Sequence, residues 1–166
     1  MVTEVDHHAT KTRIKEILQA DPLLYDSTGR ENKLVDVFVG RPYANNITAH
    51  PTPYCFIANE DSLEEQEPDG VVENNSTKST RHDCHYILVI VDDAQDGREV
   101  EKLLDNLGKL TMQTLKGNFE LRNPTGNTDP KCDWSFPERV SVFEASENGK
   151  PIQGRAIHFH IIVHTN

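Results

Sequence analysis

The chain has 166 residues, a length that suits one domain with a hydrophobic core of its own. Its formal net charge of −10, from 27 acidic and 17 basic residues, argues against a surface that attracts nucleic acid through phosphate. Three cysteines without a CxxC pair exclude a simple disulfide framework, and no apolar stretch suits a signal peptide or a membrane span. We therefore expect one cytosolic domain over residues 1–166, with residues 1–9 as a flexible arm.

The N-terminal third is predicted to hold one helix and two short strands. Apolar residues at helical spacing indicate a helix over residues 10–20, with Thr10 as its N-cap. Pro22 ends this helix, because the residue before a proline is kept out of the α region. Runs of β-forming residues then predict strands over 34–39 and 54–58.

A polar excursion over residues 60–81 interrupts this pattern. Six of its first ten side chains are acidic and none is basic. Such a segment is either a disordered loop or the tip of a long hairpin. A loop of this length in a small domain often carries function.

The middle of the chain predicts a central strand followed by the main helix. Residues 82–91 form the strand, and they are apolar on both faces from residue 86 onward. Asp96 starts the helix with Glu99 three residues later as a capping box, and Gly117 ends it. The apolar stripe of this helix comprises Val100, Leu103, Leu104, Leu107, Leu110 and Thr111.

Two less regular segments follow this helix. Residues 119–121 are predicted to form a short strand. Residues 123–137 contain three prolines and a glycine and are predicted to be a loop. Trp134 and Phe136 are expected to anchor that loop on the core or on a neighbouring molecule.

A β-hairpin closes the chain. Its strands are predicted over residues 139–145 and 153–164, and the Asn148-Gly149 pair is typical of the turn between them. In the last strand Ile157, Phe159, Ile161 and Val163 face one way, and His158, His160, Ile162 and His164 face the other. The element order predicts an α+β fold, with a mostly antiparallel β-sheet flanked by two helices on one face.

Four side chains are candidates for a metal site. His158 and His160 lie two residues apart on one strand face, and His82 and Cys84 have the same spacing on another strand. If the two strands paired in register, the four side chains would suit zinc. The pattern matches no known zinc signature, so ordinary histidines on a polar face are the preferred interpretation, with no metal and no cofactor.

The sequence carries no catalytic motif that we can assign. It lacks a G-x-S-x-G elbow, a phosphate-binding loop and a G-x-G-x-x-G fingerprint. Cys84 and His85 are neighbours in a strand and point to opposite faces, so they make no dyad. Lys102, Lys109 and Lys116 recur every seven residues and are interpreted as a solvated helix face. We therefore do not expect an enzyme.

The layout resembles the tail-terminator and tail-completion proteins of tailed bacteriophages and related viruses. Members typically begin with a short helix ending in L-x-A-D-x-x-L, which here is LQADPLL at residues 18–24. The proline-bracketed strand PYCFI, a long loop, the strand and helix YILVIVDDAQDGREVEKLLDNL, and the final strand GRAIHFHIIVH follow in the same order. The resemblance covers most of the chain. It departs from the usual pattern in the long acidic insertion and in the extended loop at 122–137.

This resemblance implies a structural virion protein. The chain would form a homo-hexameric ring that ends the tail tube on the side of the head, contacts tail tube and neck or head-completion proteins, and is assembled in the host cytoplasm. Contacts would involve edge strands and the two insertions, with Glu64, Glu65, Glu67, Trp134 and Phe136 as candidate residues. Acidic side chains facing the lumen would let DNA pass without specific binding, and no membrane is involved.

Three other interpretations stay open at this point. A head-closure or head–tail joining protein of the neck would also be oligomeric. A small metal-binding module would use the histidines and Cys84. A host adaptor domain would be a stable monomer that recruits a partner through the acidic segment.

Overall fold

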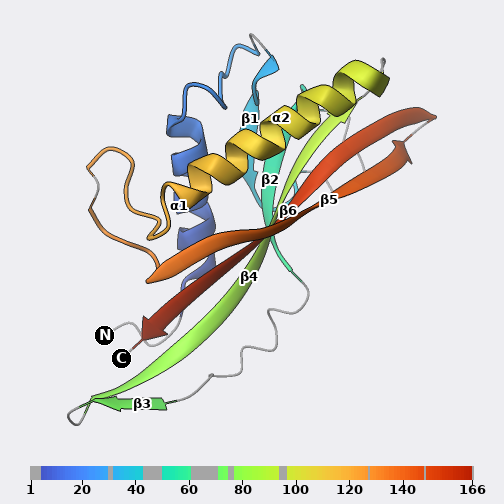
Figure 1. Ribbon diagram of the computed structural model, residues 1–166. Helices are drawn as coiled ribbons and strands as arrows, with labels where there is room; N and C mark the ends of the chain where they lie inside the picture. Colours follow the sequence, from blue (N-terminus) through green and yellow to red (C-terminus); the bar gives the residue numbers. More distant parts are fainter. Residues whose placement is uncertain are drawn as a thin grey trace.

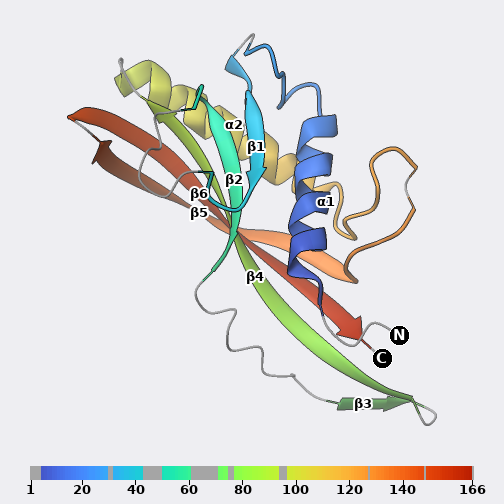
Figure 2. The same ribbon diagram turned by 180° about the vertical axis from the view of Figure 1, so that it is seen from behind.

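A computed structural model describes residues 5–29, 32–42, 50–60, 71–74, 77–93, 97–126, 128–147 and 149–165. The elements are α1 (His7–Ala20), β1 (Asp36–Val39), β2 (Tyr54–Asn59), β3 (Val71–Asn74), β4 (Thr77–Asp93), α2 (Gly97–Lys116), β5 (Trp134–Glu147) and β6 (Lys150–Thr165). Figure 1 shows two helices lying across a strongly twisted sheet, and Figure 2 shows the same arrangement from behind. Within the described residues, no helix has the length and apolar character needed to cross a membrane.

One sheet contains all the strands. Their order is β1-β2-β4-β6-β5, and β3 pairs with β4 beside this path. The β1–β2 pair is parallel, whereas the pairs made by β4 with β2, β3 and β6, and by β5 with β6, are antiparallel. The predicted α+β fold with a mostly antiparallel sheet is therefore confirmed.

Both helices pack on the same face of the sheet, which we call the covered face. Alternate residues of each strand point toward it, because successive side chains of a strand leave on opposite sides. The large apolar core between helices and sheet includes Ile14, Leu18, Leu88, Leu104 and Phe159, all fully buried. The helix stripe predicted on α2 contributes to this core, as expected from its periodicity.

The opposite face of the sheet, which we call the open face, has no helix over it among the described residues. One half of it is apolar and contains Tyr54, Phe56, Val89, Val91 and Ile152, all buried. There Phe143 of β5 lies over Gly154 of β6, where a Cβ atom would come within 2.1 Å of the ring. The other half carries histidines and carboxylates.

The N-cap of helix α1 lies four residues earlier than the sequence predicts. The N-cap is Asp6, whose side chain accepts a hydrogen bond from the Ala9 N–H at 2.9 Å. The predicted cap, Thr10, lies inside the helix and donates its hydroxyl to the Asp6 carbonyl at 2.9 Å. The expectation that residues 1–9 are a flexible arm is thus wrong for 7–9, and residues 1–4 lie outside the described part.

Helix α2 follows the prediction closely where it is described. Its predicted start at Asp96 lies outside the described residues, and its first described residue is Gly97. Its end is as expected: Gly117 N–H bonds to the Gln113 carbonyl at 3.0 Å, and Asn118 N–H bonds to the Leu115 carbonyl at 3.1 Å.

Three strands are longer than the sequence indicates. Strands β4, β5 and β6 contain 17, 14 and 16 residues. The short strand predicted over 119–121 is wrong, because Leu121 has a left-handed backbone with φ of +51°. The loop predicted over 123–137 is wrong for 134–137, which belong to β5. In the excursion at 60–81, β3 and the start of β4 form a hairpin that projects away from the helices (Figure 1), and residues 61–70 lie outside the described part.

A buried arginine fixes the segment between α2 and β5. The Arg13 guanidinium, from α1, donates to the carbonyls of Leu121 at 3.1 Å and Asp129 at 2.7 Å, and to the Asp129 carboxylate at 3.0 Å. Its Nε also bonds to Glu16 at 3.0 Å. Leu121 and Asp129 both have positive φ. One side chain therefore holds the two strained positions of this segment against α1.

Candidate functional site

The histidine-rich half of the open face brings three strands together around His160. This residue of β6 is the direct partner of His85 on β4 and of Phe136 on β5. The centres of the His85 and His160 rings are 4.2 Å apart, and the ring planes are tilted by 30° to each other. The Phe136 ring lies 5.0 Å from His160 on the other side. His160 is thus held between an imidazole and a phenyl ring.

Carboxylates approach both nitrogens of the His160 ring. Its Nε2 lies 2.8 Å from Oδ1 of Asp83, and its Nδ1 lies 3.1 Å from Oε1 of Glu138. Burial alone would raise the Asp83 pKa, but the hydrogen bonds from Arg81 and His160 outweigh it and lower that pKa. The second Asp83 oxygen, Oδ2, is enclosed and has no hydrogen-bond partner within the described residues.

A β-bulge places Glu138 in this cluster. Pro137 pairs with Phe159 and Arg139 pairs with His158, so Glu138 is the extra residue between them. Bulges bend a strand locally and re-aim side chains. Pro137 fits here because β5 is an outer strand, where a missing N–H breaks no inner ladder. Donor atoms of His85, Glu138 and His160 all lie within 4.8 Å of one another.

The remaining histidines of this face have separate partners. His158 pairs with the Glu60 carboxylate and lies 3.1 Å from the Ser141 hydroxyl. His164 lies 2.9 Å from the Asp133 carboxylate. These contacts make a band of histidine–carboxylate pairs that follows β6 across the open face.

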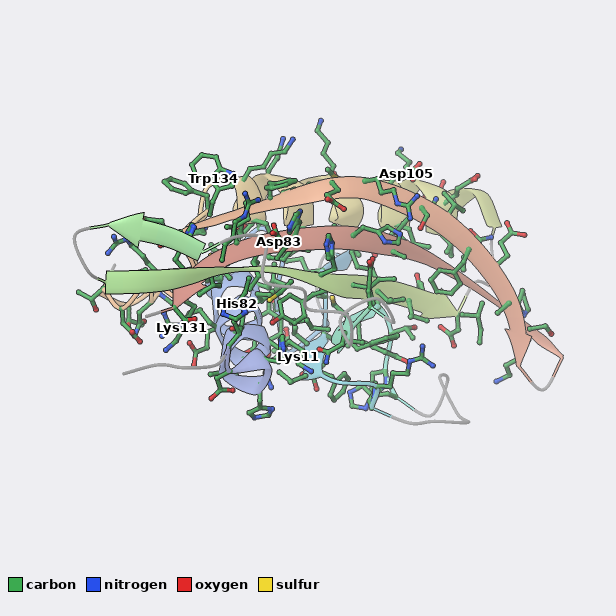
Figure 3. The ribbon with its side chains drawn as sticks, turned by 90° about the horizontal axis from the view of Figure 1, so that it is seen from below. Lys11, His82, Asp83, Asp105, Lys131 and Trp134 are labelled. Carbon is green, nitrogen blue, oxygen red and sulfur yellow. The ribbon has the colours of Figure 1, made fainter. Side chains whose placement is uncertain are left out.

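The four metal candidates from the sequence do not come together. Strands β4 and β6 do pair, but His82 aligns with Val163 and Cys84 with Ile161, both on the covered face. His158 and His160 point to the open face instead. In Figure 3, the side chains of His82 and Asp83 leave β4 in different directions. The histidine on β4 that meets His160 is His85, which the sequence analysis considered only as a neighbour of Cys84.

All three cysteines are buried thiols of low reactivity. Burial raises the pKa of Cys55 to about 12, that of Cys84 to about 11 and that of Cys132 to about 12. The thiolate is the form that attacks and that ligates metals. These environments favour the protonated thiol at all three positions.

The second candidate surface is the outer edge of the sheet. Strand β5 pairs with β6 alone among the described strands, so its other edge is unpaired there. Large apolar side chains are exposed along it: Trp134 is 50% exposed, Val140 40% and Val142 62%. Figure 3 shows Trp134 projecting at the margin of the sheet. Its ring lies 4.6 Å from that of Phe119, which follows α2 in the chain.

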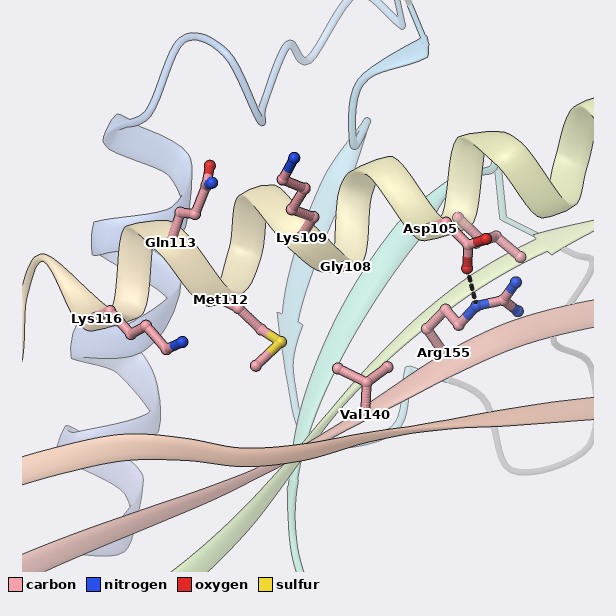
Figure 4. A pocket seen from close by; sticks show the side chains of 9 residues that line it. Asp105, Gly108, Lys109, Met112, Gln113, Lys116, Val140 and Arg155 are labelled. Atoms are coloured by element: carbon pink, nitrogen blue, oxygen red, sulfur yellow. Dashed lines mark hydrogen bonds and ion pairs between the residues drawn. The ribbon is translucent and has the colours of Figure 1, made fainter.

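A groove runs between this edge and α2 (Figure 4). Leu104, Met112 and Val140 provide its apolar lining, and Lys109 and Lys116 stand at its rim. Arg155 closes one end; its guanidinium is buried and bonds to Asp105 at 2.9 Å. Two of the lysines that the sequence assigned to a solvated helix face therefore also border this groove.

The acidic contact candidates Glu64, Glu65 and Glu67 lie outside the described residues. Of the two aromatic candidates, Trp134 is at the exposed edge and Phe136 packs on His160. Sequence reasoning missed His85, Asp83 and Glu138. All four residues of His82–His85 carry polar or ligand side chains. The sequence therefore did not indicate which alternate pair would face His160.

Comparisons with known proteins report on the fold. No protein-family model matches the chain, and no curated protein matches it in sequence. The chain is similar in three dimensions to a chain of a solved structure described as the virion of the native gene transfer agent (GTA) particle. The TM-score is 0.51 at 11% identity, and the match covers 96% of this chain and 99% of the other. The similarity therefore extends over nearly the whole length of both chains, and at this identity it concerns the fold alone.

Proposed function

We propose that the chain is a structural protein of a phage-like virion, and specifically a tail terminator that forms a ring at the head-proximal end of the tail tube. The observation that carries this proposal is the fold shared with a chain of a GTA virion over nearly the full length of both proteins. The element order that resembles tail-terminator proteins points in the same direction. In this role the protein would act by assembly and not as an enzyme.

The β5 edge supplies a surface suited to contact between copies. An unpaired strand edge offers N–H and C=O groups to another strand. Exposed Val140 and Val142 add apolar area beside the groove along α2. A neighbouring subunit that covers this edge would bury both features at once.

The charge of the chain fits a ring around a DNA passage. A net charge of −10 per chain gives an assembled ring a strongly negative field. A lumen of that sign would repel the phosphates of a passing genome and prevent adhesion. We extend this role to Glu64, Glu65 and Glu67; charge reversal there that left DNA ejection unchanged would exclude them as lumen residues.

The test is the absolute mass of the purified chain by light scattering across concentration. A ring of six 18.8 kDa chains, or growth toward that mass, is the expected result. Val142→Lys places a charge on the exposed edge and should abolish assembly. Asn106→Lys, an equal change on the exposed side of α2, is the matched control and should leave the mass unchanged.

A monomer at every concentration, also in the presence of isolated tail tubes, would contradict the terminator role. The head-closure alternative predicts a ring too, but one that binds the neck and not the tube. Sedimentation with purified tail tubes separates these two outcomes.

A further inference from the structure

We propose that His85, Glu138 and His160 bind one transition-metal ion, with zinc as the reference ion, on the open face of the sheet. The proposal is independent of the virion role. Two imidazoles and one carboxylate make a mixed nitrogen and oxygen donor set, which suits Zn²⁺ and neighbouring divalent ions rather than Ca²⁺ or Mg²⁺. Three protein ligands leave a fourth position for water or for a group from a partner.

The geometry is close to what such a site needs. Ligands of a tetrahedral zinc at its usual bond lengths lie roughly 3.3 Å from one another. Here Nδ1 of His160 and Oε1 of Glu138 are 3.1 Å apart, and the three donor atoms lie within 4.8 Å of one another. The rings of His85 and His160 now lie face to face, so His85 would turn its ring to aim a nitrogen lone pair at an ion shared with His160.

The hydrogen bonds of His160 explain why a cation fits this position. A neutral imidazole donates from one nitrogen only. If Nε2 donates to Asp83, the lone pair of Nδ1 faces the Glu138 oxygen at 3.1 Å. Two acceptor atoms then face and repel each other. A metal ion bound by both atoms would remove this repulsion. Asp83 acts as the carboxylate that orients a metal-bound histidine.

Two further observations support the same assignment. Oδ2 of Asp83 is enclosed without a hydrogen-bond partner in the described part of the chain, and a cation nearby would add to the compensation that Arg81 gives this carboxylate at 3.1 Å. The bulge at Glu138 delivers the only anionic ligand from β5, the outer strand. A bound ion would link β5 to β4 across β6. It would thereby hold β5 in place, which pairs with β6 alone among the described strands.

The experiment is calorimetric titration of Zn²⁺ into the full chain after removal of metal with chelator. Wild type is expected to bind one ion per chain. His85→Gln, Glu138→Gln and His160→Gln should each weaken binding at least tenfold. His164→Gln on the same strand face and His82→Gln on the covered face are matched controls that should bind as wild type does.

Second measurements guard against unfolded variants and test the coordination. Circular dichroism without metal must match wild type before a loss of binding is counted; a variant that fails is replaced by its Asn counterpart. Co²⁺ should give the intense visible absorption of a four-coordinate site, and Glu138→Gln should remove it. Asp83→Asn should weaken Zn²⁺ binding by about 10-fold to 100-fold while keeping that spectrum.

Zinc binding that His82→Gln or His164→Gln weakens as much as the ligand variants would overturn the proposal. A wild-type chain that binds no Zn²⁺ would overturn it as well.

Discussion

The two faces of the sheet are stabilised by different means. On the covered face, two helices and the strands enclose a continuous apolar core that contains Tyr86 and Phe159. On the open face, the apolar cluster stops half-way along the strands, and histidine–carboxylate pairs occupy the rest. Apolar burial is non-directional, whereas the pairs depend on register and protonation. Apolar burial is more extensive on the covered face, so we expect that face to contribute more of the stability.

The largest expected effect comes from opening a cavity on the covered face. Phe159→Ala removes a fully buried ring and should lower the free energy of unfolding by about 3–5 kcal/mol. Phe143→Ala on the open face removes a ring that is only partly buried, and it should cost less in proportion to the area lost. Urea denaturation of both variants measures the contrast. Equal losses would show that the two faces contribute alike.

The next largest effect tests the polar anchor between α1 and the segment before β5. Arg13→Met keeps the aliphatic stem but leaves the carbonyls of Leu121 and Asp129 without their donor, at a cost of about 2–3 kcal/mol. Arg122→Met removes an arginine whose carboxylate partner, Glu120, is a surface residue, and it should change stability little. Thermal melting compares the two. An Arg13 variant as stable as the Arg122 variant would mean that the buried network contributes nothing net.

Overpacking of the open face should have an intermediate effect. A Cβ at residue 154 would lie 2.1 Å from the Phe143 ring and 2.9 Å from the Ile90 carbonyl oxygen. Gly154→Ala should therefore cost about 1–3 kcal/mol. The double variant Gly154→Ala/Phe143→Leu should recover part of the loss, because the ring is the closer obstacle. No loss in the single variant would show that Phe143 can leave its place freely.

These contrasts also explain which features the sequence could reveal. The apolar stripe on α2 repeats over several helical turns, and the alternation along β6 repeats over several pairs of residues. Both patterns were therefore predictable from the sequence. The start of β5 was not, because Trp134 to Pro137 contains a proline that normally indicates a loop. That proline lies at a bulge on an outer strand, where no inner hydrogen bond is lost. An outer position depends on the tertiary fold and is not written in the local sequence.

The site depended on register, which local patterns leave open. His82, Asp83, Cys84 and His85 supply polar or ligand side chains to both faces of β4. A shift of one residue in the pairing with β6 would bring the other pair beside His160. The spacing of His158 and His160 was correctly recognised as one face of a strand. The residues that surround His160 could not be predicted in this way, because they depend on the pairing of His85 with His160 and on the bulge at Glu138. Both features arise only in the folded sheet.

The smallest expected effect is a pH dependence from the covered face. Burial is the main reason that the pKa of His7 lies below 6.5, followed by the charge of Lys11. The unfolded chain therefore binds the proton more readily, so stability is complete above pH 6.5 and falls as the pH drops through the lower folded pKa. Its Nδ1 also lies 2.6 Å from the Tyr86 hydroxyl, a contact that the neutral ring can accept.

Unfolding measured at pH 7.5 and at pH 5.5 isolates this contribution when wild type is compared with His7→Gln. The rest of the chain is the same in both proteins, so the difference between them reports on His7. Wild type should lose more stability than the variant over this interval. The loss should stay small because His7 is only partly buried and Asp6 favours its charged form. A larger loss in the variant would mean that charged His7 stabilises the fold, and that the acid response of the covered face has the opposite sign.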